Sequence, residues 1–169
     1  ALELLSGQTS PSGFEGPAAQ AARELLEPLM DEVWIDRLGN VIGVRRCGRE
    51  NAKKLLLDAH LDEIGLMVTG IEDGFLRFRS IGGVDPRMLP DRELTILTEP
   101  PLFGVVACMP PHVLKEGEAD KSIPISELYI DIGMSQEQAE KAIPIGTPIS
   151  YRGSCFPLGE KEVCGKSMD

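Results

Sequence analysis

Two acids flank one of the chain's two histidines at alternate positions, within the stretch KKLLLDAHLDEIGLMV (53–68). Side chains alternate along an extended strand, so Asp58, His60 and Asp62 would project to one side of it. An imidazole that binds a metal ion usually has its second ring nitrogen held by an acceptor such as a carboxylate. The pattern favours the hypothesis that His60 is a metal ligand and that Asp62 fixes its tautomer.

The same triplet also fits a histidine with a purely structural role. H-x-D is a short pattern, and a single histidine at a strand end often serves only to make hydrogen bonds. A catalytic zinc ion typically has three protein ligands and a water. One imidazole is too few, so the other ligands would have to come from carboxylates that are distant in the sequence or lie beyond it.

The leucine run before His60 indicates the element that would carry it. The apolar run 55–57 is continuous, which is typical of a central strand covered on both faces. Ligands of open α/β sheets bind beyond the carboxyl ends of the strands, and His60 lies at that end of the run. The sequence therefore predicts a buried strand over 53–60 that ends at the histidine.

The preceding segment predicts a helix and a hairpin. GPAAQAARELLEPLM (16–30) has Pro17 at a position that suits the first helical turn, and Pro28 should end or bend the helix. EVWIDR (32–37) and VIGVRR (41–46) predict two strands joined by a short Gly-Asn turn. A helix followed by strands of this kind suggests the opening of an α/β domain.

From about residue 67 the sequence changes to short β-forming runs separated by Gly and Pro turn signals. This spacing predicts a small closed or sandwich-like β domain. One helix interrupts the strands, because Ser135 is followed three residues later by Gln138, which is a capping-box pattern. The six predicted strands are LMVTGI, FLRFRSI, ELTILT, GVVACM, ELYIDI and TPISYRG.

Composition excludes several classes of function. The 169 residues carry a net charge of −10, which disfavours a nucleic-acid partner because phosphate binding needs a basic face. No apolar run approaches the roughly 20 residues of a membrane span, and the N-terminus lacks the features of a signal peptide. Four cysteines, at 47, 108, 155 and 164, lack C-x-x-C spacing. We expect reduced thiols in a cytoplasmic protein.

Five motifs occur in the order found in a known family: PSGFEG (11–16), DRLGNVIG (36–43), LLLDAHLDEIGLMV (55–68), GVVACMPPHVL (104–114) and GKSMD (165–169). Through these motifs the chain resembles the dinuclear metallo-aminopeptidases, which include glutamyl aminopeptidases, tetrahedral aminopeptidases and cellulase-M-like proteins. The resemblance extends over essentially the whole chain, and AHLDEIGLMV is its most specific part.

The resemblance implies a fold and a domain plan. It implies a partial α/β catalytic domain of the phosphorylase/hydrolase-like fold with a small β-barrel domain inserted into it. Residues 1–66 would be the first part of the catalytic domain, 67–157 the inserted barrel and 158–169 the return to the catalytic domain. The insert is implied to make homo-oligomer contacts, with dimers assembling into a tetrahedral dodecamer. We expect the chain to be the N-terminal part of a longer enzyme.

The resemblance also implies a site for two divalent ions, zinc or cobalt. His60 is implied to be a terminal ligand of one ion, Asp169 to bridge both ions, and Asp62 to be the catalytic-site acid that orients His60. Two such ions about 3.5–4 Å apart can share and activate a water that attacks a peptide carbonyl. The implied reaction is removal of N-terminal residues from peptide substrates.

The rest of the family's active site lies beyond the bridging aspartate, including the general-base glutamate and the second histidine. We therefore expect this chain alone to be inactive. His112 lies inside the insert, so we interpret it as a loop or interface residue that does not replace the second histidine.

Two other functions remain open. A glycoside hydrolase of the cellulase type would need two suitably spaced carboxyl groups and no metal, and no such pair stands out. A non-catalytic oligomerisation module would use the β insert for assembly and leave His60 structural. The segment PSGFEG (11–16) lacks the strand–GxGxxG–helix context of a nucleotide loop, and we interpret it as a turn leading into the helix.

Overall fold

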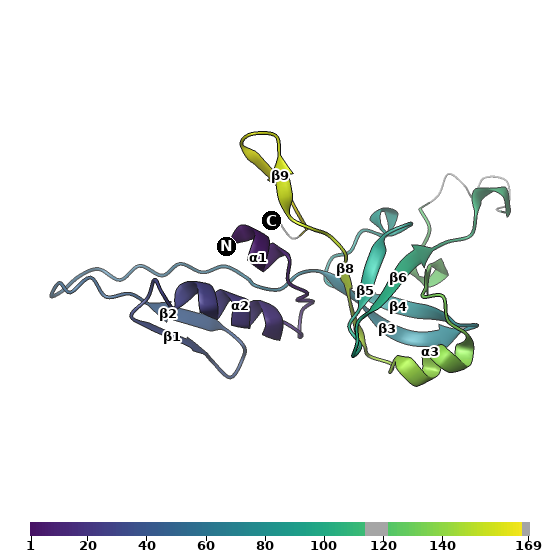
Figure 1. Ribbon diagram of the computed structural model, residues 1–169, viewed down its shortest axis with the longest axis horizontal. Coiled ribbons are helices and arrows are strands. Elements are labelled where there is room, and N and C mark those ends of the chain that lie inside the picture. Colours follow the sequence, from purple (N-terminus) through teal and green to yellow (C-terminus); the bar gives the residue numbers. More distant parts are fainter. Residues whose placement is uncertain (114–121, 167–169) are drawn as a thin grey trace. The chain divides into compact units, whose positions relative to one another are not determined.

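The computed structural model describes residues 1–113 and 122–166 (Figure 1). The chain forms two compact units: one comprises Ala1–Glu63 and the segment that begins at Ser154, and the other comprises Ile64–Gly153. No helix in the described ranges combines the length and the apolar character needed to cross a membrane.

In its described residues, the first unit contains two helices and two hairpins. Pro17 occupies the first turn of α2, which ends before Pro28, as the sequence predicted. The predicted hairpin is also confirmed, with Trp34 opposite Ile42 in an antiparallel pair. The elements of this unit are α1 (Leu2–Ser6), α2 (Gly16–Leu26), β1 (Glu32–Ile35), β2 (Val41–Val44), β9 (Phe156–Leu158) and β10 (Glu162–Cys164).

The strand predicted over 53–60 is wrong for this structure. Residues 52–62 form no strand, and the side chains of Leu55, Leu56 and Leu57 are 84–86% exposed. A strand forms only where neighbouring chain satisfies its backbone N–H and C=O groups. No strand in the described part of the chain pairs with this run, so its apolar character alone does not produce a strand.

The second unit is a closed six-stranded barrel in which every neighbouring pair is antiparallel. The strand order around the barrel is β3-β4-β7-β6-β5-β8. The strands are β3 (Gly65–Glu72), β4 (Phe75–Ile81), β5 (Glu93–Ile96), β6 (Leu102–Ala107), β7 (Tyr129–Asp131) and β8 (Pro148–Tyr151). This arrangement confirms that the β-rich part of the sequence forms a small closed domain.

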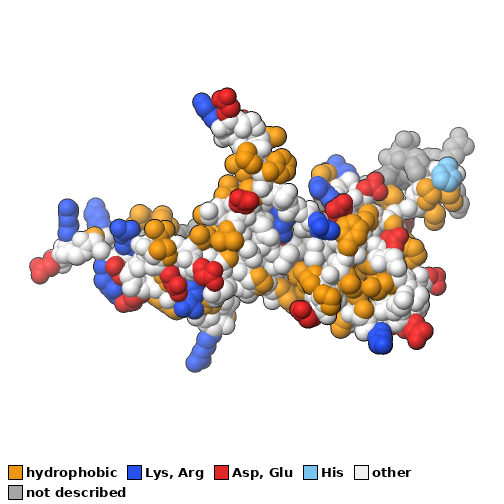
Figure 2. All heavy atoms as spheres, in the orientation of Figure 1, with side chains coloured by type: hydrophobic (Ala, Val, Ile, Leu, Met, Phe, Trp, Pro, Cys, Tyr) orange, Lys and Arg blue, Asp and Glu red, His pale blue; other side chains and the backbone are white. Residues whose placement is uncertain are grey.

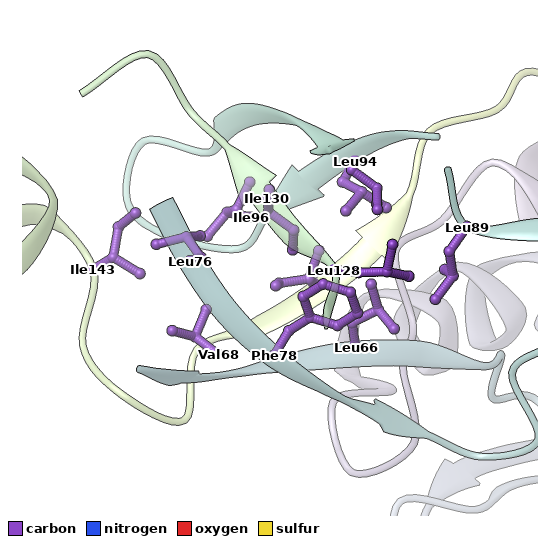
Figure 3. Close-up of a cluster of buried hydrophobic side chains, with 12 residues drawn as sticks. Leu66, Val68, Leu76, Phe78, Leu89, Leu94, Ile96, Leu128, Ile130 and Ile143 are labelled. Carbon is purple, nitrogen blue, oxygen red and sulfur yellow. The ribbon is translucent and has the colours of Figure 1, made fainter. Parts of the chain in front are cut away.

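Buried aliphatic side chains fill the barrel, as Figure 3 shows. Leu66, Leu76, Leu94, Ile130 and Ile149 come from five different strands, and each is fully buried. Alternation along each strand sends these residues inward, which is how a small barrel builds a core from side chains alone.

Short helical segments complete the second unit. Helix α3 (Gln136–Ala142) begins with the predicted capping box, in which Ser135 and Gln138 each accept a hydrogen bond from the other's backbone N–H. The 3-10 turns among the described residues are Pro86–Met88, Pro111–Val113 and Ile125–Glu127.

Candidate metal-binding site

The imidazole of His60 is oriented by the residue two positions later. Its Nδ1 lies 3.0 Å from the backbone oxygen of Asp62 and 3.1 Å from Oδ1 of the Asp62 carboxylate. Both partners are acceptors, so they are satisfied by the tautomer that carries its proton on Nδ1. In that tautomer Nε2 holds the lone pair, which is the state that a metal-binding histidine requires. The side chain of His60 is 63% exposed, so the ring is accessible.

Ser12 holds the other oxygen of the same carboxylate. Its hydroxyl donates a hydrogen bond to Oδ2 of Asp62, while Oδ1 faces the imidazole. The bond from Ser12 is the largest influence that lowers the pKa of Asp62 below its usual value, and His60 lowers it further while burial opposes both. Asp62 is therefore an ionised acceptor at neutral pH, with a separate donor for each oxygen.

The segment that contains Ser12 runs beside the residues that follow His60. Glu63 donates its backbone N–H to the oxygen of Ser10 over 2.9 Å, and the N–H of Ser10 donates to Oε1 of Glu63 over 3.1 Å. Pro11 and Glu63 form a parallel β-bridge. These contacts fix the backbone of Glu63, and they join segments about fifty positions apart.

Lys166 reaches the same place from the end of the chain. Its Nζ donates to Oε1 of Glu63 over 2.9 Å and to the backbone oxygen of Gln8 over 2.7 Å. The two charged side chains are 4% exposed for Glu63 and 11% exposed for Lys166. This buried ion pair connects the HLDEIG stretch to the GKSMD stretch, which are separated by 103 positions.

A small cavity of about 140 Å³ opens beside the histidine. Apolar side chains of Leu2 and Leu5 in α1 line one part of it, and the His60 segment lines another. The hydroxyl of Ser6 is buried there and has no hydrogen-bond partner among the described residues. The cavity therefore combines an apolar wall with polar groups near the imidazole.

The other residues singled out in the sequence have different outcomes. Asp58 lies in the exposed segment that forms no strand, so the alternation that would align it with His60 does not arise. Asp169 lies outside the described residues. His112 is exposed in the 3-10 turn Pro111–Val113 of the barrel unit. Across residues 1–113 and 122–166, no group of three or more His, Cys, Asp and Glu side chains could hold a metal ion.

Sequence reasoning missed three residues of this cluster: Ser12, Glu63 and Lys166. Ser12 and Lys166 both lie in motifs noted in the sequence, but PSGFEG was interpreted only as a turn and GKSMD only for its aspartate. The sequence signal available for two of them is an acid shortly after His60 and a lysine shortly before Asp169, whereas nothing in the sequence points to the bond between Ser12 and Asp62.

Comparison with known proteins places this chain in a class of peptidases. The family described as M42 glutamyl aminopeptidase matches residues 39–169, which is most of the chain. The chain belongs to the M42 glutamyl aminopeptidase family.

Two curated relatives illustrate this membership. The chain is 39% identical to the lysyl aminopeptidase of Pyrococcus furiosus, over 86% of this chain and 43% of the relative. It is 32% identical to the glutamyl aminopeptidase of Lactococcus lactis, over 83% of this chain and 41% of the relative. The chain spans about half the length of the curated relatives it matches.

Solved structures agree with the same class. An aminopeptidase of the archaeon Desulfurococcus kamchatkensis superposes with a TM-score of 0.89 at 36% identity, over 99% of this chain and 46% of that one. A protein of Thermotoga maritima described as an endoglucanase superposes with a TM-score of 0.80 at 35% identity, over the whole of this chain and 50% of that one.

Proposed function

We propose that this chain is the N-terminal portion of a metal-dependent aminopeptidase that removes N-terminal residues from peptides. The observation that carries the proposal is the orientation of His60 by Asp62 in a chain of the M42 family. Its relatives include proteins named for aminopeptidase activity on lysyl and glutamyl substrates.

The described residues offer one ligand suited to a divalent metal ion, the imidazole of His60. An imidazole whose Nδ1 is held by acceptors, and whose ring is accessible, is suited to coordination through Nε2. We propose His60 and Asp169 as ligands of a site for two divalent ions, zinc or cobalt, and Asp62 as the acid that holds the ring. Bound ions of this kind would lower the pKa of a water and polarise a peptide carbonyl.

The residues of this chain would supply orientation and basicity. Ionised Asp62 accepts a hydrogen bond from the Nδ1–H of His60 and thereby increases the electron density at Nε2. Ser12 keeps the carboxylate in the rotamer that faces the ring. Both effects would act before any substrate binds, so the site would be preorganised.

We further propose the finer fold suggested by the sequence: a phosphorylase/hydrolase-like α/β domain, present in part as residues 1–66 and 158–169, with the barrel of 67–157 inserted into it. The exposure of the leucine run at 55–57 supports this proposal, because such a run is suited to the interior of a larger sheet.

The barrel is the part we propose for assembly into a homo-oligomer, with dimers that build a tetrahedral dodecamer. Two structures similar to this chain support it: one is described as the PhTET1-12s dodecamer, and the other as a Pyrococcus horikoshii TET1 peptidase that assembles into a tetrahedron or an octahedral shell. A cytoplasmic location is proposed from the four free cysteines.

The test uses the chain's two histidines as a matched pair. Cobalt binding would be followed by calorimetry in the longer protein that carries this chain and in its His60→Ala and His112→Ala variants. We expect His60→Ala to lose binding and His112→Ala to keep it. Equal binding by the longer protein and its His60→Ala variant would contradict the ligand assignment.

The activity itself would be tested on the longer protein that carries this chain. We expect hydrolysis of aminoacyl-p-nitroanilides that stops with a chelator and returns when cobalt or zinc is added. The Thermotoga maritima protein described as an endoglucanase favours glycoside hydrolysis as the second candidate. Cellulose-oligomer hydrolysis that survives the chelator would support that candidate instead.

A further inference from the structure

The segment that carries Ser12 has only a short backbone pairing to hold it in place. Pro11 and Glu63 form an isolated parallel bridge that belongs to no strand. Pro11 has no backbone N–H, so it cannot donate to a ladder at this point. The N–H of Glu63 donates to the oxygen of Ser10 over 2.9 Å. A pairing this short gains few backbone bonds, so side-chain contacts are needed to fix its register.

Glu63 and Lys166 supply such contacts. Oε1 of Glu63 accepts hydrogen bonds from the backbone N–H of Ser10 over 3.1 Å and from Nζ of Lys166 over 2.9 Å. The same Nζ donates to the backbone oxygen of Gln8 over 2.7 Å. The two charged side chains therefore bind the segment at two points, Gln8 and Ser10, shortly before it reaches Ser12.

Stability alone does not account for two charges at this place. The side chains of Glu63 and Lys166 are almost fully buried, and Lys and Glu are rarely buried unless they are paired. Moving them out of water costs free energy that their mutual attraction only roughly offsets, and apolar residues of similar size are often equally stabilising. What the charged pair adds is directional bonding to backbone groups, which fixes one segment at one point along another.

The bond between Ser12 and Asp62 depends on this register. Ser12 directly follows the bridged residue Pro11, and Asp62 directly precedes Glu63. A slip of one residue along an extended segment displaces a side chain by about 3.3 Å. A hydroxyl–carboxylate hydrogen bond is confined to about 2.5–3.0 Å. A slipped segment would therefore separate Ser12 from Asp62, whose other oxygen faces His60.

We propose that Glu63 and Lys166 are positioning residues for the imidazole of the candidate site. Their buried pair holds the segment of Ser12 in register, and Ser12 in turn keeps Asp62 facing the Nδ1 of His60. This inference rests on the proposed function, in which Nε2 of that imidazole binds a metal ion. Both charges act on the ring through the Ser12–Asp62 bond.

The first experiment needs no metal. Crystal structures of the metal-free longer protein would be determined with and without the substitutions Glu63→Met/Lys166→Met, called the apolar double variant. Both charges are replaced because removing one would leave the other buried without its partner. We expect a folded variant in which the Ser12–Asp62 bond is lost and the His60 ring has turned. An intact Ser12–Asp62 bond in that variant would overturn the proposal.

The second experiment is a double-mutant cycle that measures the Co²⁺ affinity of the longer protein. We expect Ser12→Ala and the apolar double variant each to weaken Co²⁺ binding about 10-fold, since each removes support from a metal-binding histidine. Because both act through one bond, combining them should also cost about 10-fold, whereas independent effects would multiply to about 100-fold. An unchanged affinity in the apolar double variant, or a multiplied loss in the combination, would overturn the proposal.

A conservative variant serves if the apolar one fails to fold. Glu63→Gln/Lys166→Gln removes both charges and keeps groups that can hydrogen-bond to the backbone of Ser10 and Gln8. It should weaken Co²⁺ binding by less than about 10-fold, and this loss should disappear when Ser12→Ala is already present. A loss of the same size in both backgrounds would show that the pair does not act through Ser12.

An exposed ion pair in the same unit is the matched control. Arg46 donates to Glu32 over 2.7 Å, and both side chains are exposed. Glu32→Met/Arg46→Met makes the same chemical change at the surface. It should leave the Co²⁺ affinity unchanged, both alone and together with Ser12→Ala.

The outcomes separate the positioning role from the proposed function. If His60→Ala binds Co²⁺ as well as the unsubstituted protein does, but the apolar double variant breaks the Ser12–Asp62 bond, the pair still positions the segment and only the metal assignment fails. If His60→Ala abolishes binding while the apolar double variant keeps both the bond and the affinity, the metal assignment stands and the positioning role fails.

Discussion

The two units of this chain differ in how completely each pairs its strands and buries its apolar side chains. The barrel closes its sheet, so each of its six strands has a paired neighbour on both sides, and it buries a cluster of hydrophobic side chains. The first unit buries mainly small side chains of α2 and leaves its leucine run exposed. Figure 2 also shows hydrophobic side chains open to solvent around the hairpin of β9 and β10, where Phe156 and Leu158 are about half exposed.

The difference shows that the large hydrophobic core and the proposed site residues lie in different units. The barrel has a complete core and none of the proposed metal ligands. The first unit holds His60, Asp62, Ser12 and the buried ion pair, but its apolar surface is incompletely covered. In the first unit, specific hydrogen bonds therefore fix the positions of the polar side chains, and a large core does not.

The largest effect expected from this comparison comes from one leucine in each unit. Leu76 is fully buried in the barrel, whereas Leu56 is exposed. Leu76→Ala should lower the free energy of unfolding by about 3 kcal/mol through lost burial and the cavity left behind. Leu56→Ala should change it by less than about 0.5 kcal/mol. Urea denaturation measures both, and similar losses would contradict the contrast between the units.

Two glycines of the barrel unit test how tightly its turns are packed. Gly74 has φ of 88°, and a Cβ there would lie 2.1 Å from the backbone oxygen of Met134. Gly146 has a similar φ of 89° but meets nothing within 4 Å. Gly74→Ala should therefore cost at least about 2 kcal/mol, and Gly146→Ala about 1 kcal/mol. Thermal melts of the two variants would test this, and equal melting temperatures would mean that the contact with Met134 relaxes freely.

The polar geometry of the first unit is tested at Ser12. Ser12→Ala removes the hydrogen bond that most lowers the pKa of Asp62, so that pKa should rise toward its ordinary value of 3.8. A lowered folded-state pKa contributes stability above the unfolded value, and this contribution is lost as pH falls through the folded pKa. The variant should therefore lose about 1 kcal/mol at neutral pH and show less acid sensitivity below pH 4.

The control for Ser12 is a hydroxyl of the same unit. Ser6→Ala removes a buried hydroxyl that has no hydrogen-bond partner in the described residues, and it should leave the pKa of Asp62 unchanged. NMR titration of the Asp62 carboxyl follows both variants. A shift of the same size in Ser6→Ala would mean that the cavity, rather than the Ser12 bond, sets the pKa.

The smallest effect is expected at the surface of the barrel unit. Asp85 accepts hydrogen bonds from the backbone and side chain of Arg87, which lower its pKa to about 2. Arg87→Ala should raise that pKa toward 3.8, as seen in a carboxyl NMR titration. Any stability linked to this pair is present above pH 3.8 and lost between about pH 3.8 and 2. Because the pair is solvent-exposed, we expect no resolvable change in unfolding at neutral pH.

Much of the local structure could be predicted from the sequence. Helix α2, the β1–β2 hairpin, the capping box of α3 and all six barrel strands follow from patterns within a few residues. The short helix α1 was missed, because five residues are too few to show a helical period. The strand expected at 53–60 failed because a strand depends on partners that an apolar run does not specify.

The sequence by itself determined the pairing of His60 with Asp62, because two residues in one short stretch can meet through local backbone geometry. Only the tertiary structure decided that Ser12 holds Asp62 and that Lys166 reaches Glu63, since these partners are 50 and 103 positions apart. Hydrogen bonds over such separations leave no period in the sequence. They exist only once the chain has folded and brought the groups within 3 Å of each other.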